Sequence, residues 1–258
     1  MVIDQTLFLL VPVFFGISFI YSSVGFGGGS SYIAVLVLVG VSLFTVPTIA
    51  LPLNIVVAGM AMYHYIRAKH FSLRFSLPFA SSIPASFIAG MITLPVKSTI
   101  IIFVIALFSS SAALFISRIK KFQGSTNSRL KMDSVKLTII GIPVGIILGT
   151  IAGLVGIGGG IWLSPLLILA GLANPKLAAA TASFFIVTNS ISGFLAHSLS
   201  KPIDPYFLLP LVGIVLVGGF LGSRLGAFKF DHNKITIIVG IVVAIAGMDL
   251  LFFKLLNH

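Results

Sequence analysis

Long stretches without a charged side chain are the feature that most constrains this chain. Seven such windows cover residues 5–66, 75–96, 98–117, 137–175, 177–200, 205–223 and 235–248. A helix that crosses a hydrocarbon core of about 30 Å needs about 20 apolar residues. Most windows match one crossing, whereas 5–66 has room for three helical segments and 137–175 for two. The pattern predicts an all-α, polytopic membrane protein.

The composition excludes several other classes of protein. Charged residues make up 8% of the chain, against about 25% in soluble domains, so a soluble enzyme, a nucleic-acid binder, a disordered chain and a disulfide scaffold are excluded. The net charge of +11 indicates no nucleic-acid partner, because the basic residues lie in short gaps between apolar runs. The chain has no cysteine and no Glu, and we expect neither a metal nor a cofactor.

The apolar runs predict about eight to ten membrane segments. We expect helices near 5–24, 30–42, 46–66, 75–94, 98–117, 136–155, 160–172, 177–199, 206–228 and 235–254. The first stretch carries Asp4 and no basic region, so we interpret it as a membrane segment and not as a signal peptide. The polar, basic stretch 118–135 predicts a cytoplasmic linker between a first membrane repeat, 1–117, and a second, 136–258.

A glycine motif occurs twice, once in each of these halves. Val24-Gly25-Phe26-Gly27-Gly28-Gly29 returns 131 positions later as Val155-Gly156-Ile157-Gly158-Gly159-Gly160. Each copy ends an apolar helix and opens a short apolar segment, and a polar helix with Asn54 or Asn189 follows. The duplication predicts two homologous halves, each with a glycine-broken helix or re-entrant hairpin, as in repeat-built transporters.

Broken helices at membrane depth suggest a small anion as the ligand. Free N–H and C=O groups there cost several kcal/mol each unless something satisfies them. The helices that start near Ser30 and Ile161 aim their first N–H groups and positive dipole ends at the breaks, and glycine lets a ligand approach. The alternative is close helix packing on small residues. The predicted substrate-binding residues are Gly25, Gly27, Gly28, Gly29, Ser30, Asn54, Gly156, Gly158, Gly159, Gly160, Thr181 and Asn189.

The distribution of basic residues favours inverted halves. If each broken segment folds back as a hairpin, the halves are inverted, and 13 of 16 Lys and Arg side chains lie on the linker side. The three exceptions are then Lys97, Lys201 and Lys254. If each segment crosses once, the halves are parallel and only 11 lie on that side. The margin favours inversion with cytoplasmic basic loops and leaves the parallel arrangement open.

These motifs resemble the sulfite exporter TauE/SafE family of membrane permeases. The second motif continues as Gly158-Gly159-Gly160-Ile161-Trp162-Leu163-Ser164-Pro165-Leu166, and Gly222-Ser223-Arg224-Leu225-Gly226 is also similar to the family pattern. The resemblance spans nearly the whole chain and implies a secondary transporter of sulfite, sulfonates such as sulfoacetate, or related organic anions. The first half departs from the pattern, since Ala34 stands where the second copy has Pro165.

Further polar residues are candidates for coupling or for neutralising the anion. Thr181, Thr188 and Ser192 share one helix face, where they would line a cavity or bond to a neighbouring helix. His64 and His197 lie near the ends of the polar helices and titrate near neutral pH, although interfacial positions are the alternative. Arg224 would neutralise an anion or snorkel to the interface. Asp249 lies near the end of the last predicted helix, where an interfacial position is favoured.

Taken together, the residues favour a secondary anion transporter in the cell membrane that works by alternating access. An anion channel with the same broken helices is the first alternative. An intramembrane enzyme is the second, and the absence of cysteine and paired carboxylates argues against it. The expected partners are a small anion and the lipid bilayer. A homodimer stays open, as do the anion itself, the direction of transport and the coupling ion.

Overall fold

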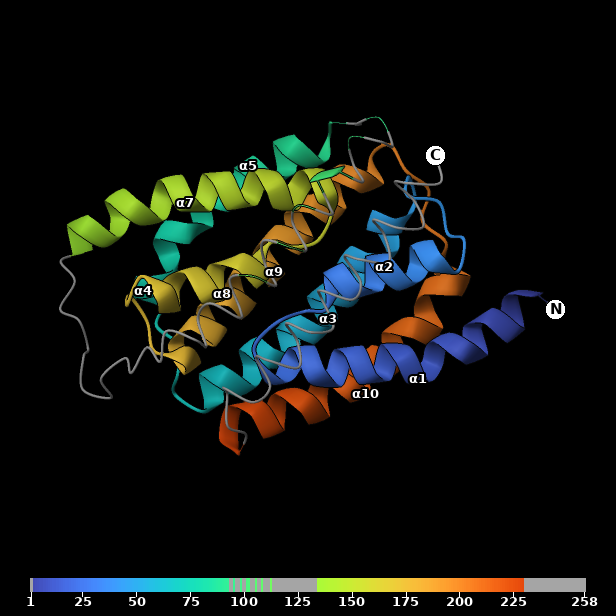
Figure 1. Ribbon diagram of the computed structural model, residues 1–258, viewed down its shortest axis with the longest axis horizontal. Helices are drawn as coiled ribbons and strands as arrows, with labels where there is room; N and C mark the ends of the chain where they lie inside the picture. The colour runs from blue at the N-terminus through green and yellow to red at the C-terminus, as the bar shows by residue number, and fades with distance from the viewer. Residues whose placement is uncertain are drawn as a thin grey trace.

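Helices form all the regular structure in the described part of the chain, as the apolar runs predict. The computed structural model describes residues 2–92, scattered positions between 95 and 112, and residues 134–229. Its elements (Figure 1) are α1 (Val2–Ser23), α2 (Gly29–Leu38), α3 (Val46–Arg67), α4 (Leu73–Ser76), the 3-10 segment η1 (Leu77–Ser81), α5 (Ser82–Gly90), α7 (Ser134–Val155), α8 (Gly160–Leu169), α9 (Pro175–Ser198) and α10 (Pro205–Phe228).

Four of these helices are long and apolar enough to cross a membrane. They are α3, α7 from Val135 onward, α9 and α10. In contrast, α2 and α8 have 10 residues each, and such a helix is about 15 Å long, half of a hydrocarbon core. The helix expected at 235–254, with Asp249, lies outside the described residues, and so does most of 98–117 and of the linker 118–135.

The single helix expected at 75–94 is divided in the structure. A short α-helical turn, α4, leads through the 3-10 segment η1 into α5, which ends at Gly90. Pro78 stands in the first turn of η1. A proline has no N–H to donate and its ring clashes with the carbonyl four residues before it, so it interrupts an α-helical ladder. The apolar sequence pattern is therefore continuous over 75–94, although the α-helix is interrupted there.

Helices of the first half of the sequence pack in pairs with helices of the second half. Gly218 of α10 lies against Ser18 of α1, and Gly226 lies against Ser23, so α1 and α10 run parallel. The matching pair is α5 and α7, which are also parallel. Figure 1 shows α5 and α7 together on one side, α1 and α10 on the other, and α3 and α9 between them. Each side of the molecule thus contains helices from both halves.

Small residues make these helix pairs possible. On α7 every fourth residue of the contact with η1 and α5 is glycine: Gly141, Gly145, Gly149 and Gly153. On α10 the residues that face α1 in this way are Gly218, Gly222 and Gly226. A Cβ at most of these positions would meet backbone atoms of the neighbouring helix, so glycine allows the close approach that holds membrane helices together.

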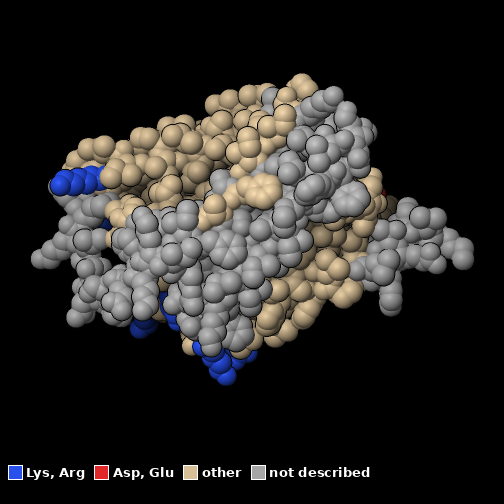
Figure 2. Space-filling model, in the orientation of Figure 1, with Lys and Arg blue, Asp and Glu red and all other residues tan. Residues whose placement is uncertain are grey.

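The central helices run in opposite directions. Asn54 of α3 meets Ser190 of α9, and Thr48 meets Pro202 just beyond the end of α9. In consequence α1, α3 and α10 run one way, while α5, α7 and α9 run the other. Seven described basic residues lie at the end where α3 and α10 finish: Arg67, Lys69, Arg74, Lys136, Lys176, Arg224 and Lys229. Figure 2 shows blue side chains gathered at this end of the visible face.

Candidate functional site

The two glycine motifs fold in the same local way. Gly28 (φ +88°) and Gly159 (φ +69°) have left-handed backbone and immediately precede α2 and α8. Both short helices end the same way, with Gly40 and Gly171 at positive φ. Three of their closing hydrogen bonds correspond at an offset of 131 residues, among them Gly40 N–H to Val37 O and Gly171 N–H to Ile168 O. Left-handed backbone favours glycine, so the motif determines the break locally.

Each short helix folds back instead of continuing across. The N–H of Gly29, at the start of α2, donates to Asn54 Oδ1 eight residues inside α3, while residues 39–45 join the end of α2 to the start of α3. Therefore α2 runs antiparallel to α3 and to α1. In the same way Gly160 lies beside Ile186, halfway along α9, and α8 ends at the turn that starts α9. Both breaks are hairpins at mid-helix depth.

One buried amide joins the two breaks. The side chain of Asn54 accepts a hydrogen bond from Gly29 N–H (3.1 Å), and its Nδ2 donates to Ile157 O and to Ser190 Oγ, both at 3.1 Å. Asn54 is 1% exposed. Gly29 belongs to the first motif, Ile157 to the second and Ser190 to α9, so this amide satisfies backbone groups of both broken helices.

The glycines leave room for this amide. A Cβ at Gly27 would overlap Asn54 Oδ1, and a Cβ at Gly158 would overlap Asn54 Nδ2 and Ser190 Oγ. Thus the space that two glycines leave open, one from each motif, is filled by a side chain of the protein itself. An anion that approached the Gly29 N–H would have to displace Asn54.

The second break differs from the first. Ile186 lies against Gly160 in the place that Asn54 takes against Gly29. No side chain of the described residues accepts a hydrogen bond from the Gly160 N–H. Gly160, at the start of α8, therefore presents its N–H and the positive end of a helix dipole without a polar cap among the described residues.

The predicted residues Thr181 and Asn189 face another neighbour. Thr181 Oγ1 accepts a hydrogen bond from Ser76 Oγ (3.2 Å), and Asn189 Nδ2 donates to Ser82 Oγ (2.8 Å). Ser192 Oγ also bonds across, to Ile83 O. These residues form a polar seam between α9 and the α4–α5 segment, and Thr188 instead bonds to the backbone of its own helix. The Oδ1 of Asn189 is buried without a partner among the described residues.

The remaining predicted groups make other contacts. Gly25 packs against Ala179 of α9 and Gly156 against Pro47 of α3, so each break rests on the central helix of the other half. Ser30 is buried at the start of α2. His64 lies between α3 and α10, with Nδ1 2.8 Å from Ser223 Oγ.

Arg224 has an exposed side chain on the surface of α10. It lies at the basic end of the molecule and does not enter either break. This position fits the second of the two roles that the sequence left open for Arg224, a side chain that extends to the membrane interface.

The helices before the breaks are capped by different side chains. Tyr65 of α3 donates its hydroxyl proton to Ser23 O, the last residue of α1, at 2.8 Å. His197 of α9 approaches Gly153 O, in the last turn of α7, with Nε2 at 3.0 Å. Lys201 Nζ is 2.8 Å from the other ring nitrogen of His197. Both caps satisfy C-terminal carbonyl groups, but only the second one carries an imidazole and an ammonium.

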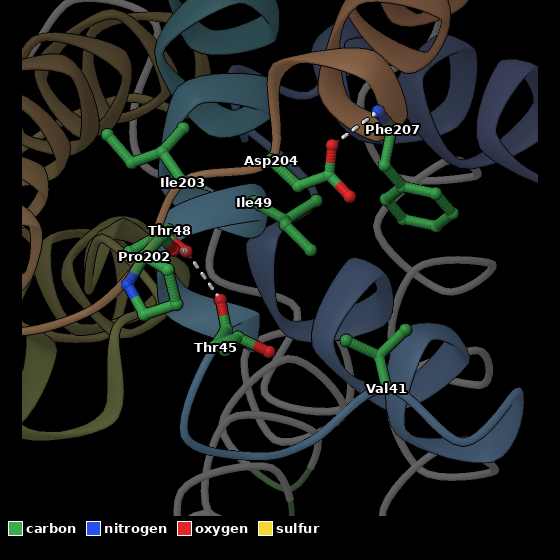
Figure 3. Close-up of a pocket in the computed structure, with 8 residues that line it drawn as sticks. All are labelled: Val41, Thr45, Thr48, Ile49, Pro202, Ile203, Asp204 and Phe207. Carbon is green, nitrogen blue, oxygen red and sulfur yellow. Dashed lines mark hydrogen bonds between the residues drawn. The ribbon is translucent and has the colours of Figure 1, made fainter.

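A pocket of about 430 Å³ opens beside Lys201. It lies at the end of the molecule opposite the basic cluster, between the start of α3 and the turn from α9 to α10 (Figure 3). Its lining residues are Val41, Thr45, Thr48, Ile49, Pro202, Ile203, Asp204 and Phe207. Asp204 Oδ1 caps α10 by accepting the N–H groups of Tyr206 and Phe207, and Thr48 Oγ1 donates to Pro202 O (2.9 Å).

Sequence reasoning missed four of the groups at the breaks. Ser190, Tyr65 and Lys201 contact the breaks or the helix ends before them, and Ile186 fills the second one. The spacing of His197 and Lys201, four residues apart, was a usable signal for neighbours on one helical face. Nothing local marks the other three, because their contacts are made between distant segments.

Comparison with known proteins relates this chain to membrane transporters. The family model of the sulfite exporter TauE/SafE family matches residues 10–250. A probable membrane transporter protein, y4hK, from Sinorhizobium fredii is 27% identical over 251 residues, which cover 94% of this chain and 97% of the relative. Another, YunE from Bacillus subtilis, is 34% identical over 44% of this chain and 41% of its own length. No solved structure matches the chain.

The chain belongs to the TauE/SafE family, since the family model covers nearly its whole length. A plant relative, sulfite exporter TauE/SafE family protein 3 from Arabidopsis thaliana, is 32% identical over 31% of this chain and 17% of its own length. The resemblance seen in the motifs is thereby confirmed. The protein is a membrane-embedded transporter of the TauE/SafE type, which fits its apolar helices.

Proposed function

We propose that this TauE/SafE protein is a secondary transporter of small sulfur-containing or organic anions, such as sulfite and sulfoacetate, and that it works by alternating access. The observation that carries the proposal is the meeting of two broken helices at one buried amide, that of Asn54. Discontinuous helices whose N-termini meet near the midplane are a recurring device for binding anionic groups in transporters. The family match supports the transporter class.

The anion would bind at the start of α8 and draw the Asn54 amide toward it. The N–H of Gly160 is uncapped among the described residues, and the helix dipole adds positive potential there. Asn54 Nδ2 and Ser190 Oγ lie beside Gly158 and would supply further donors. When no anion is bound, Asn54 bonds to the backbone of both motifs and closes the gap.

The transport step would be a movement of the two mixed helix groups. One group contains α1, α3 and α10 and the other contains α5, α7 and α9, and their directions are opposite. We infer that the halves are inverted repeats, because hydrogen bonds at the ends of α2 and α8 correspond at one offset, while α1 and α3 run opposite to their counterparts α7 and α9. The end that carries seven basic residues would face the cytoplasm of a cell membrane.

Reconstitution in proteoliposomes tests this function. We expect saturable sulfite or sulfoacetate flux with counterflow, which an anion channel would not show. Gly28→Leu or Gly159→Leu should abolish flux, because each places a side chain in a break, and size-exclusion chromatography selects the variants that stay folded.

Gly59→Leu on α3 is the matched control, since a Cβ at Gly59 meets no atom within 4 Å. Flux in both break variants that equals that of the control would contradict the assignment of the breaks as the binding site. Flux without saturation or counterflow would favour the channel.

A further inference from the structure

Two buried hydrogen-bond donors at the second break have no acceptor among the described residues. One is the Gly160 N–H at the start of α8. The other is the hydroxyl proton of Ser190, a residue that is 0% exposed and whose Oγ accepts from Asn54 Nδ2. A Cβ at Gly158 would overlap this Oγ, and Ile186, one turn earlier on α9, lies against Gly160. Buried donors without acceptors are costly, so the break favours a ligand that supplies acceptor oxygens.

No charged side chain lies at this break. The second motif packs against α3, α7 and α9. Each charged side chain or histidine on these helices is six or more residues along its helix from the residues that contact the motif, a separation of about 9 Å or more. These side chains are His64, Arg67, Lys136, Lys176 and His197. No Lys or Arg occurs in the sequence windows 98–117 and 235–248 either.

The positive potential at the second break therefore comes from the start of α8. The N-terminus of a helix is equivalent to about half an elementary charge. The corresponding group of the first break, the Gly29 N–H, already donates to Asn54 Oδ1. One negative charge on a ligand matches this potential, whereas a second one would be buried without a partner, which is costly.

We propose that the second break binds anions with a single negative charge in preference to anions of the same shape with two. The inference rests on the proposed function and narrows its substrate class. Sulfite is then carried as hydrogensulfite, and monosulfonates and monocarboxylates are accepted. Sulfoacetate, which has two acidic groups, binds more weakly. The selection needs no titrating side chain, because the ligand itself gains or loses the charge.

Two probes of the same shape separate charge from size. Methanesulfonate has one negative charge at both pH 6 and pH 9, whereas methylphosphonate has one at pH 6 and two at pH 9. Thermal unfolding of the purified wild-type protein with increasing amounts of each probe gives the apparent Kd. We expect the ratio of the methylphosphonate Kd to the methanesulfonate Kd to rise about tenfold or more from pH 6 to pH 9.

Titration of the protein itself is controlled at Lys201. Burial lowers the pKa of Lys201 to about 8, so its ammonium loses charge over the same pH range, and this loss would weaken a dianion more than a monoanion. His197, which lies between Lys201 and Gly153 O, connects it to the end of α7. We expect the same rise of the ratio in Lys201→Met. A rise that disappears in this variant would assign the selection to Lys201 and overturn the proposal.

A pair of serine variants places the binding at the break. Ser190→Ala removes the free donor, so the Kd of methanesulfonate should rise about tenfold at both pH values. Ser183→Ala is the matched control, because Ser183 is also 0% exposed on α9 but donates to Ala180 O of its own helix. Size-exclusion profiles check folding, and the wild-type titration decides the proposal if Ser190→Ala does not fold. Equal binding in the two variants would overturn the placement at the break.

A wild-type ratio that stays constant or falls from pH 6 to pH 9 would overturn the charge selection, and so would a failure of methanesulfonate to bind. Sulfite flux with counterflow tests the proposed function separately. Flux together with a constant ratio would contradict the charge selection alone. A rising ratio without flux would support the charge selection and contradict the transporter function.

Discussion

The two glycine breaks have a similar backbone, apart from the positive φ of Gly158 in the second, but they differ in the side chains that close them. At the first break Asn54 bonds to the Gly29 N–H and Tyr65 caps the preceding helix. At the second, Ile186 lies against Gly160, while His197 and Lys201 cap the preceding helix. The first break is thus closed by groups that do not titrate near neutral pH. At the second break the start of α8 has no side-chain cap, and the end of α7 is capped by a titratable imidazole. We expect these properties in the half of the protein that binds an anion.

The largest expected effect comes from filling the space beside Asn54. Gly158→Ala adds a Cβ that overlaps the Asn54 amide, which should cost about 1–3 kcal/mol of folding stability. The left-handed backbone at Gly158 (φ +74°) adds about 1–2 kcal/mol. Denaturant unfolding in detergent measures both.

Gly27→Ala is the matched variant at the first break. Its added Cβ lies even closer to Asn54 Oδ1, but at a residue without a positive φ, so its loss of stability should come from the overlap alone. Equal stability of Gly158→Ala and wild type would mean that the two motifs do not meet at Asn54.

An intermediate effect should separate the two asparagines. Asn54→Ala leaves Gly29 N–H and Ile157 O buried without partners, which should cost about 1–3 kcal/mol. Asn189→Ala loses the bond to Ser82 but also removes an unpartnered oxygen, so its cost should be about 1 kcal/mol or less. Thermal unfolding of both variants gives the order. The opposite order would place the central polar contact in the α5–α9 seam.

The smallest effect concerns the cap of the first break. Tyr65→Phe removes the hydrogen bond to Ser23 O and should lower stability by about 0.5–1.5 kcal/mol. Because no group at this cap titrates near neutral pH, the loss should be the same at pH 6 and pH 8. If the loss of stability in Tyr65→Phe varied between pH 6 and pH 8, the cap of the first break would depend on pH as well, and the two caps would not differ in this respect.

The sequence predicted the breaks and the helices better than it predicted the contacts at the breaks. Glycine at positive φ is a local requirement, so the motif was enough to place both breaks, while a hairpin and a single crossing both stayed open. The division of 75–94 was missed, because the apolar pattern continues through Pro78 while the backbone changes to a 3-10 segment. Asn54 was found as the asparagine on the polar helix that follows the first motif, with Asn189 as its counterpart after the second. Its partners were not, since Ile157 and Ser190 lie more than 100 residues away in the chain.

The sequence by itself determined that this protein lies in a membrane, and it determined the local backbone at the two breaks. Its charge-free runs require a membrane, and its glycines allow a left-handed residue before each short helix. Only the tertiary structure decided which side chains meet there. In space the position of Asn54 against the first break is matched by Ile186 and not by Asn189. Successive side chains of a helix point about 100° apart around its axis. The register between two packed helices therefore decides which side chains meet at each break.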